Sequence, residues 1–262
     1  MKQWIAEIGE SFAEAGTSSH LLMDMDAFNG SMYTIATNVM GITLTIAYVI
    51  LALFFVLELL KVSVKVEGAG GGSTFGAEMV FKVMFKMVLC KLAVDSSLLF
   101  MGAIYEVGQT IIRGIGSLDG VTAVDLSASA MLIDNMSLGA QIGMLLELII
   151  IKFGVWITLS LVQIICIGRF IEIYVHVAIS PIPIATFPSE ELSSIAKNFF
   201  KSFAAVCLQG VFIYIILAFF PSLFLENLFG ALNGFSLFLY SIVLVMAIFA
   251  SGRWARSICN VM

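Results

Sequence analysis

The chain has 262 residues, of which 60% are hydrophobic and 12% are charged, with a net charge of −5. Soluble domains carry about 25% charged residues, so this composition excludes a water-soluble globular protein. It predicts an all-α, polytopic membrane protein, in which catalysis or DNA reading would need a partner or a cavity between spans.

Residues 1–31 are expected to form an external amphipathic segment. Trp4, Ile8 and Phe12 recur at helical spacing, with glutamates on the other faces. The segment lacks a basic start and a continuous apolar core, so we do not expect a signal peptide. Its acidic charge favours docking on the protein itself over binding to anionic lipid.

Three long charge-free stretches identify the clearest membrane spans. They lie between Asp26 and Glu58, between Lys201 and Glu226, and between Glu226 and Arg253. About 20 apolar residues cross the hydrocarbon core as a helix, so each stretch can span it. With two less pure segments, the sequence predicts five spans, at residues 33–60, 79–112, 142–180, 199–220 and 235–250. They make up a transmembrane domain of residues 32–252, followed by a short cytoplasmic tail at 253–262.

The third span is the longest. A helix over it would run roughly 57 Å, nearly twice the hydrocarbon core. Pro181, Pro183 and Pro188 remove backbone donors and disfavour helix before them, so the helix is expected to end at this proline break, near a membrane face. One long tilted helix and a span followed by a re-entrant segment both fit. Ser189 is placed to cap the next helix.

Basic residues orient the spans. Five spans place three basic groups on one side: Lys61, Lys65, Lys82, Lys86 and Lys91; Arg169, Lys197 and Lys201; Arg253 and Arg256. Acidic residues dominate the other side. We therefore predict a multi-pass plasma-membrane protein with its N-terminus outside and its C-terminus in the cytoplasm.

Several ionisable residues fall within the predicted spans, where they are costly and indicate either function or buried pairing. They are Lys91, Asp95, Glu147, Lys152, Arg169, Glu172 and His176. Lys91 and Asp95 are spaced to neutralise each other, and Glu172 is spaced to pair with Arg169 and with His176, whereas Glu147 and Lys152 are a poorer intrahelical pair. These side chains either line a translocation path or form ion pairs that fix helix register and subunit contacts.

Catalytic and metal-binding signatures are not found in the sequence. It holds no HExxH or GxSxG motif, and its four cysteines and two histidines form no metal-ligand pattern. The glycine run from Gly68 to Ser73 lacks the Gly-Lys-Ser ending of a phosphate-binding loop. We therefore expect a protein that is not an enzyme and has no cofactor.

The most specific stretch is the proline break SPIPIATF (180–187), followed by AKNFFKSFAAVCLQG (196–210). With a terminal span that ends in a basic tail, these residues resemble the TrbL-type polytopic subunit of conjugative type IV secretion systems, most closely the versions carried by integrative elements of Gram-positive bacteria. The resemblance is sharpest from Arg169 to Gly210. It implies a channel component that helps to translocate single-stranded DNA with its attached relaxase. It also implies other secretion subunits, separate ATPases and a homo-oligomer as partners, and no catalytic residue.

A DNA path favours basic groups at its cytoplasmic mouth, because phosphate contacts dominate such binding. The candidates are Lys61, Lys65, Lys82, Lys86, Lys197 and Lys201. The positive-inside rule accounts for the same lysines in any membrane protein, so both explanations stay open. The alternative function is a stand-alone secondary transporter or ion channel. Such a protein has a broken helix near the middle of the membrane and related halves.

Overall fold

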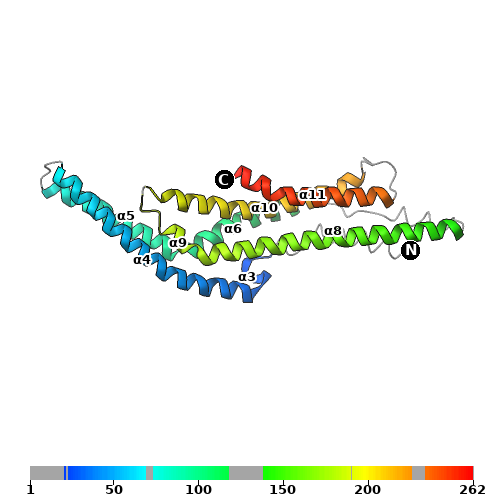
Figure 1. Cartoon of the computed structure of the whole chain (residues 1–262), viewed down its shortest axis with the longest axis horizontal. Helices are drawn as coiled ribbons and strands as arrows, with labels where there is room; N and C mark the ends of the chain where they lie inside the picture. The colour runs from blue at the N-terminus through cyan, green and yellow to red at the C-terminus, as the bar shows by residue number, and fades with distance from the viewer. Residues whose placement is uncertain are drawn as a thin grey trace. The chain divides into compact units, whose positions relative to one another are not determined.

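The computed structural model describes residues 21, 23–68, 73–117, 138–189, 191–225 and 234–261. The regular elements of this part are all helices, as the composition predicts (Figure 1). They are α3 (Met25–Phe28), α4 (Gly30–Gly68), α5 (Ser73–Asp95), α6 (Ser97–Gly116), α8 (Leu138–Ile179), α9 (Pro181–Ile184), α10 (Ser193–Leu225) and α11 (Gly234–Ile258). The predicted amphipathic helix near the N-terminus lies outside the described residues.

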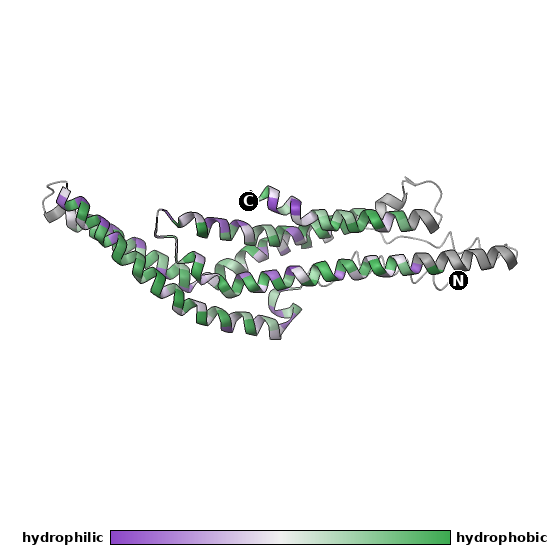
Figure 2. Ribbon diagram, viewed as in Figure 1, coloured by the Kyte–Doolittle hydropathy of each residue, from purple (hydrophilic) through white to green (hydrophobic). Residues whose placement is uncertain are grey.

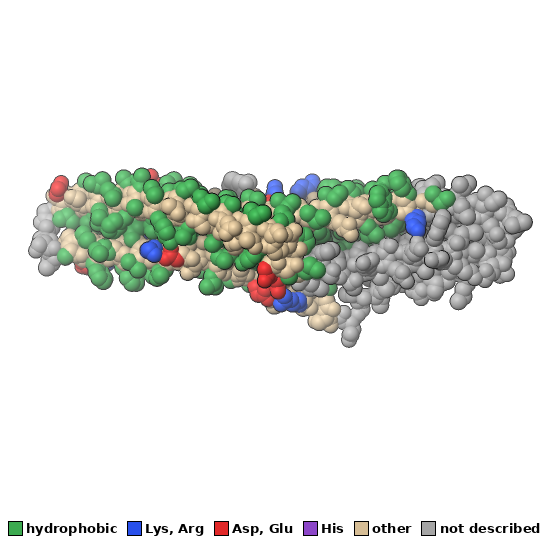
Figure 3. All heavy atoms as spheres, turned by 90° about the horizontal axis from the view of Figure 1, so that it is seen from below, with side chains coloured by type: hydrophobic (Ala, Val, Ile, Leu, Met, Phe, Trp, Pro, Cys, Tyr) green, Lys and Arg blue, Asp and Glu red, His purple; other side chains and the backbone are tan. Residues whose placement is uncertain are grey.

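Among the described residues, five helices are long and apolar enough to cross a membrane. They are α4, α6, Lys152–Ile179 of α8, Ser193–Phe220 of α10 and Phe238–Ile258 of α11. Hydrophobic residues run along them (Figure 2), and on the face drawn in Figure 3 hydrophobic side chains cover much of the described surface. On α4, Ile42, Val49 and Leu53 are all more than half exposed. Exposure of so much apolar surface to water is unfavourable, whereas its contact with lipid is not.

The predicted second span, residues 79–112, is two helices rather than one. α5 ends at Asp95 and α6 begins at Ser97. The interruption is local, because the Ser96 amide still donates to the carbonyl of Leu92 at 2.9 Å and the Phe100 amide donates to that of Ser96 at 3.1 Å. Only α6 of the two qualifies as a span. The physical reason is that the charged residues of the predicted span are concentrated in α5.

The third span is one continuous helix, α8, which ends at Ile179 directly before the proline break. Pro181 then occupies the first turn of α9, where its missing N–H costs nothing. The chain turns again up to Ser189, whose hydroxyl accepts a hydrogen bond from the Leu192 amide at 3.3 Å. The sequence predicts Ser189 as the cap of the next helix; its hydroxyl instead caps a turn, and α10 begins four residues later, at Ser193.

The described residues fall into two compact units. Unit 1 draws on residues within 1–24, 107–170 and 206–258, and unit 2 on residues within 25–106, 171–205 and 259–262. The core of unit 1 is a cluster of aliphatic and tyrosine side chains from α6, α8, α10 and α11, such as Ile112, Val162, Tyr240 and Ile248. The core of unit 2 joins α4, α5 and α9 through Ala47, Val94 and Ile184.

Candidate functional site

A polar cluster joins α4 to α5 in unit 2. The Tyr48 hydroxyl donates to Asp95 Oδ1 at 2.5 Å, and Lys91 Nζ donates to Asp95 Oδ2 at 2.7 Å. Lys91 Nζ also lies 5.5 Å from the centre of the Tyr48 ring, within the range of a cation–π contact. Both carboxylate oxygens of Asp95 are therefore engaged: the ion pair lies within α5, and the Tyr48 hydroxyl joins it to α4.

The cluster lies deep in the apolar part of α4. Tyr48 is ten residues from Glu58, the first charged residue beyond it, which is about 15 Å along a helix. That distance is half of a hydrocarbon core of about 30 Å. The Lys91 side chain is nevertheless 59% exposed and that of Asp95 32%. An exposed ion pair at this depth calls for water or a polar partner, so the geometry is compatible with both the path-lining and the subunit-contact hypotheses.

The proline break packs beside this cluster. Ile184 and Ala185 are fully buried and share a core with Ala47 of α4 and Val94 of α5. Ala47 adjoins Tyr48 in the charge-free stretch of α4, so the break packs against the apolar part of that helix. The expectation that the break lies near a membrane face stays a prediction.

The end of α8 beside the break is held by α4. Thr43 Oγ1 donates to the carbonyl of Ala178 at 2.8 Å, one of the carbonyls that the end of α8 leaves without an intrahelical donor. Broken backbone at membrane depth is tolerated where protein groups satisfy it in this way. Sequence reasoning missed Thr43 and Tyr48. Their hydroxyls inside a charge-free stretch were the available signal.

His176 makes different contacts from those expected. Its Nδ1 lies 2.8 Å from the backbone oxygen of Glu172, and its Nε2 lies 3.4 Å from Ser202 Oγ on α10. Phe199 and Phe203 lie beside its ring at centroid distances of 5.5 and 5.8 Å. The contact that involves Glu172 is thus to its main chain. This arrangement serves the packing of α8 on α10 rather than a charge pair between the two side chains.

Arg169 is buried in unit 1, with 3% of its surface exposed. Its guanidinium lies 5.3 Å from the centre of the Phe170 ring and packs against the backbone of Gly210 on α10. A methyl group at Gly210 would overlap Nη1 and Cζ of Arg169, so the glycine makes the space for this cation. Lys152 is half-buried, and the side chain of Glu147 lies outside the described residues.

The lysines proposed for a DNA path all belong to unit 2, but they differ in their partners. Lys61 lies 3.6 Å from Glu58, and Lys82 lies 2.7 Å from Glu78. The hydrogen bond from Lys82 and its charge hold the pKa of Glu78 below its ordinary value. Exposed pairs of this kind are weak but reduce the positive field that a phosphate would meet. Within the described part of the chain, no group of three or more His, Cys, Asp or Glu is placed to hold a metal ion.

Lys197 and Lys201 stand one helical turn apart on α10, and both are exposed. The turn that Ser189 caps leads into the start of α10. The two lysines lie there, before the apolar part of the helix. The six lysines form three pairs spaced four residues apart, and within the described residues the pair on α10 is the one in which both side chains are exposed and neither is in an ion pair.

These features define the class of protein. It is a polytopic α-helical membrane protein in which the predicted second span is divided into α5 and α6. Its predicted third span is the long helix α8, and a polar cluster lies beside the proline break. A family model described as "TrbL/VirB6 plasmid conjugal transfer like protein" matches residues 16–181, more than half of the chain. The chain belongs to this family, and it is a membrane component of conjugative transfer. No curated protein and no solved structure matches it.

The matched region includes α4, α5, α6, α8 and the first residue of α9. It therefore covers the polar cluster of Tyr48, Lys91 and Asp95. Of the stretch from Arg169 to Gly210 that carries the resemblance in the sequence, it covers the part up to Pro181.

Proposed function

We propose that this protein is a channel component of a conjugative type IV secretion system, and that it helps single-stranded DNA with an attached relaxase to cross the membrane. Family membership over residues 16–181 is the observation that carries this proposal. In this assignment separate ATPases supply the energy, and the chain itself catalyses no reaction. Five helices enclose little space, so the conduit is a homo-oligomer within a larger complex of secretion subunits.

Two features of unit 2 support a translocation role. The proline break interrupts the helix where Ile184 and Ala185 pack against Ala47, midway along the apolar stretch of α4. The cluster of Tyr48, Lys91 and Asp95 places charge at the same level, partly exposed. Charged groups at such a depth line water-filled paths or polar contacts in membrane proteins.

Lys197 and Lys201 are the residues that we propose to guide DNA. They are exposed and one turn apart on α10, and neither forms an ion pair within the described part of the chain. In the proposed orientation, with the N-terminus outside and the C-terminus in the cytoplasm, they face the compartment from which DNA enters. Phosphate binding by such lysines needs no sequence-specific contact, which suits a conduit that carries any transferred strand.

The experiment that tests the function is crosslinking of DNA during transfer. A photoreactive amino acid at Ser194, which is exposed on the first turn of α10, should crosslink to the transferred strand in mating cells. The same substitution at Glu78, exposed at the start of α5, serves as a comparison site in the same unit. A transferred strand that crosslinks to neither site, while it does crosslink to other subunits, would argue against a direct role in the DNA path.

The broken helix gives a second candidate some support. Secondary transporters bind their substrates at breaks near the middle of the membrane, and the break beside Ala47 has that position along α4. A stand-alone transporter or ion channel would work as a purified protein, without secretion partners. Solute or ion flux in vesicles that contain only this chain would favour this candidate, whereas flux-free vesicles together with a large native complex favour the channel subunit.

A further inference from the structure

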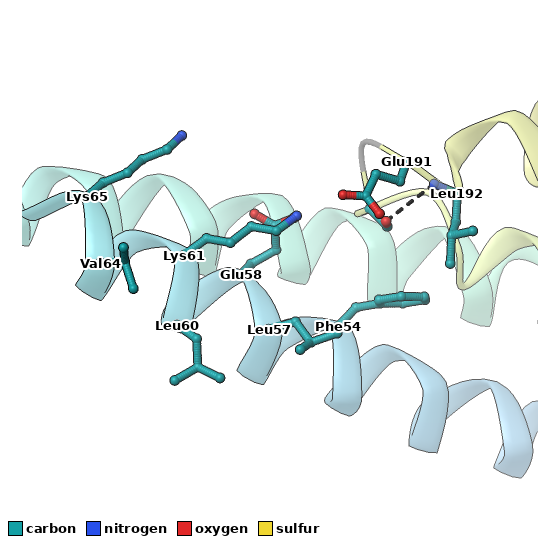
Figure 4. A pocket seen from close by; sticks show the side chains of 10 residues that line it. Phe54, Leu57, Glu58, Leu60, Lys61, Val64, Lys65, Glu191 and Leu192 are labelled. Atoms are coloured by element: carbon teal, nitrogen blue, oxygen red, sulfur yellow. Dashed lines mark hydrogen bonds and ion pairs between the residues drawn. The ribbon is translucent and has the colours of Figure 1, made fainter.

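A groove lies on unit 2 where the C-terminal part of α4 meets the turn that leads into α10 (Figure 4). Its volume is about 620 Å³, within the range of sites that take small molecules. Leu57, Lys61 and Lys65 of α4 and Glu191 and Leu192 of the turn are among the residues that line it. Ser189 fixes the turn through its bond to the Leu192 amide, so the groove has a defined second wall.

One side of the groove is apolar. Phe54, Leu57 and Val64 recur at helical spacing along α4, and Leu192 adds an apolar side chain from the turn. Leu57 is 44% exposed and Leu192 39%, so this surface is open to a ligand. It is the kind of surface against which an acyl chain packs.

The other side is charged and balanced. Lys61 and Lys65 provide two ammonium groups, and Glu58 and Glu191 provide two carboxylates. In Figure 4 these charged side chains lie away from those of Leu57 and Leu60. The closest approach of Lys61 Nζ to Glu58 is 3.6 Å, longer than a hydrogen bond, so both groups keep the capacity to bind another partner.

The groove also lies at the right level of α4 for a lipid headgroup. Glu58 is the first charged residue after the apolar stretch, and Lys61 and Lys65 follow within two turns. Phe54 and Leu57 therefore lie on the hydrocarbon side of the groove and the lysines on the headgroup side, as expected for interfacial lysines.

We propose that this groove binds a zwitterionic aminophospholipid, phosphatidylethanolamine. The lipid phosphate is bound by Lys61 and Lys65, its primary ammonium donates to Glu58 and Glu191, and one acyl chain lies along Phe54, Leu57 and Leu192. The balanced charge selects this headgroup, because an anionic lipid would meet two carboxylates and a choline headgroup has no N–H to donate. The proposal goes beyond the transfer function and does not depend on it.

The test uses the full chain, purified and stripped of lipid in detergent, and native mass spectrometry with lipids of identical acyl chains. We expect phosphatidylethanolamine to bind about tenfold more tightly than phosphatidylcholine or phosphatidylglycerol, the effect of one charge-assisted contact. Lys65→Gln and Glu191→Gln should each remove most of this preference. Lys82→Gln and Glu78→Gln change a matched pair of charges on α5 that is exposed and does not line the groove, and they should leave it unchanged.

The lipid comparison with the unaltered protein does not depend on how any variant folds. Equal binding of the ethanolamine and choline lipids would overturn the proposal, and tighter binding of phosphatidylglycerol would assign the lysines to an anionic lipid instead. A preference that survives both groove variants would place the lipid elsewhere. DNA transfer is not a readout here, so failure of this proposal and failure of the transfer function are told apart.

Discussion

Gly210 offers the sharpest test of the packing in unit 1. A Cβ at this position would overlap the guanidinium of Arg169, which is buried among helices with 3% of its surface exposed. The guanidinium ends a flexible side chain, but a buried cation has no solvated position to which it can move. Overpacking of this kind costs about 1–3 kcal/mol. Gly210→Ala should therefore destabilise the protein, although alanine is the better helix former.

Gly168 is the matched control, because it lies in α8 beside Arg169 and has nothing within 4 Å of a built Cβ. Gly168→Ala should be neutral or stabilise by about 0.5–1 kcal/mol, the ordinary helical gain. The two variants thus differ by the overlap alone, about 1–3 kcal/mol. Reversible unfolding in mixed micelles, followed by circular dichroism, measures the difference.

A double-mutant cycle tests whether the overlap with Arg169 causes the loss of stability in Gly210→Ala. In an Arg169→Ala background the overlap no longer exists, so Gly210→Ala should lose its penalty and the two substitutions should couple by about 1–3 kcal/mol. Simple additivity would refute the proposed contact, as would equal stability of the Gly210→Ala and Gly168→Ala proteins.

Three further predictions concern unit 2 and the orientation of the chain. Lys197→Glu with Lys201→Glu should abolish conjugative transfer in mating assays at unchanged protein level, because the pair would then repel phosphate. Tyr48→Phe should lower stability by about 0.5–1.5 kcal/mol in the same unfolding assay, because Asp95 loses a hydrogen bond. In a protein without native cysteines, a cysteine at position 194 should react with a membrane-impermeant maleimide only after permeabilisation, and one at position 127 should react in intact cells.

The first of these predictions has a control variant, and each has an outcome that would contradict it. Lys82→Glu also reverses the charge of an exposed lysine in unit 2, but Lys82 is already paired with Glu78, so it should reduce transfer less than the change on α10. Normal transfer by the double mutant would remove the guiding role of the α10 lysines. Unchanged stability of Tyr48→Phe would mean that the phenol contributes nothing to the hairpin. Reaction at position 194 in intact cells would reverse the proposed orientation.

Sequence patterns were sufficient for the class of protein and for most helices. Charge-free stretches such as the one before Glu58 identify spans because lipid excludes charge regardless of which helices are neighbours. The end of α8 was predicted as reliably, since Pro181 interrupts helical hydrogen bonding through its own covalent structure. The division at Ser96 was not predicted, because Ser96 is neither proline nor glycine and helical hydrogen bonds continue on both sides of it.

Only part of the candidate site could be predicted from the sequence. Lys91 and Asp95 are spaced to pair within one helix, and they do so at 2.7 Å, so this contact is local and readable from the sequence. Their third member, Tyr48, comes from 47 residues away on α4. Its role depends on the register in which α4 and α5 pack.

Hydropathy and covalent backbone chemistry act residue by residue, and by themselves they determined that this chain is a membrane protein with a long third helix ended by prolines. Register between helices depends on side-chain fit over many residues at once. Only the tertiary structure therefore decided that the proline break packs against Ala47 deep along α4, that Gly210 makes room for Arg169, and that a turn at Ser189 closes a groove over Lys61 and Lys65.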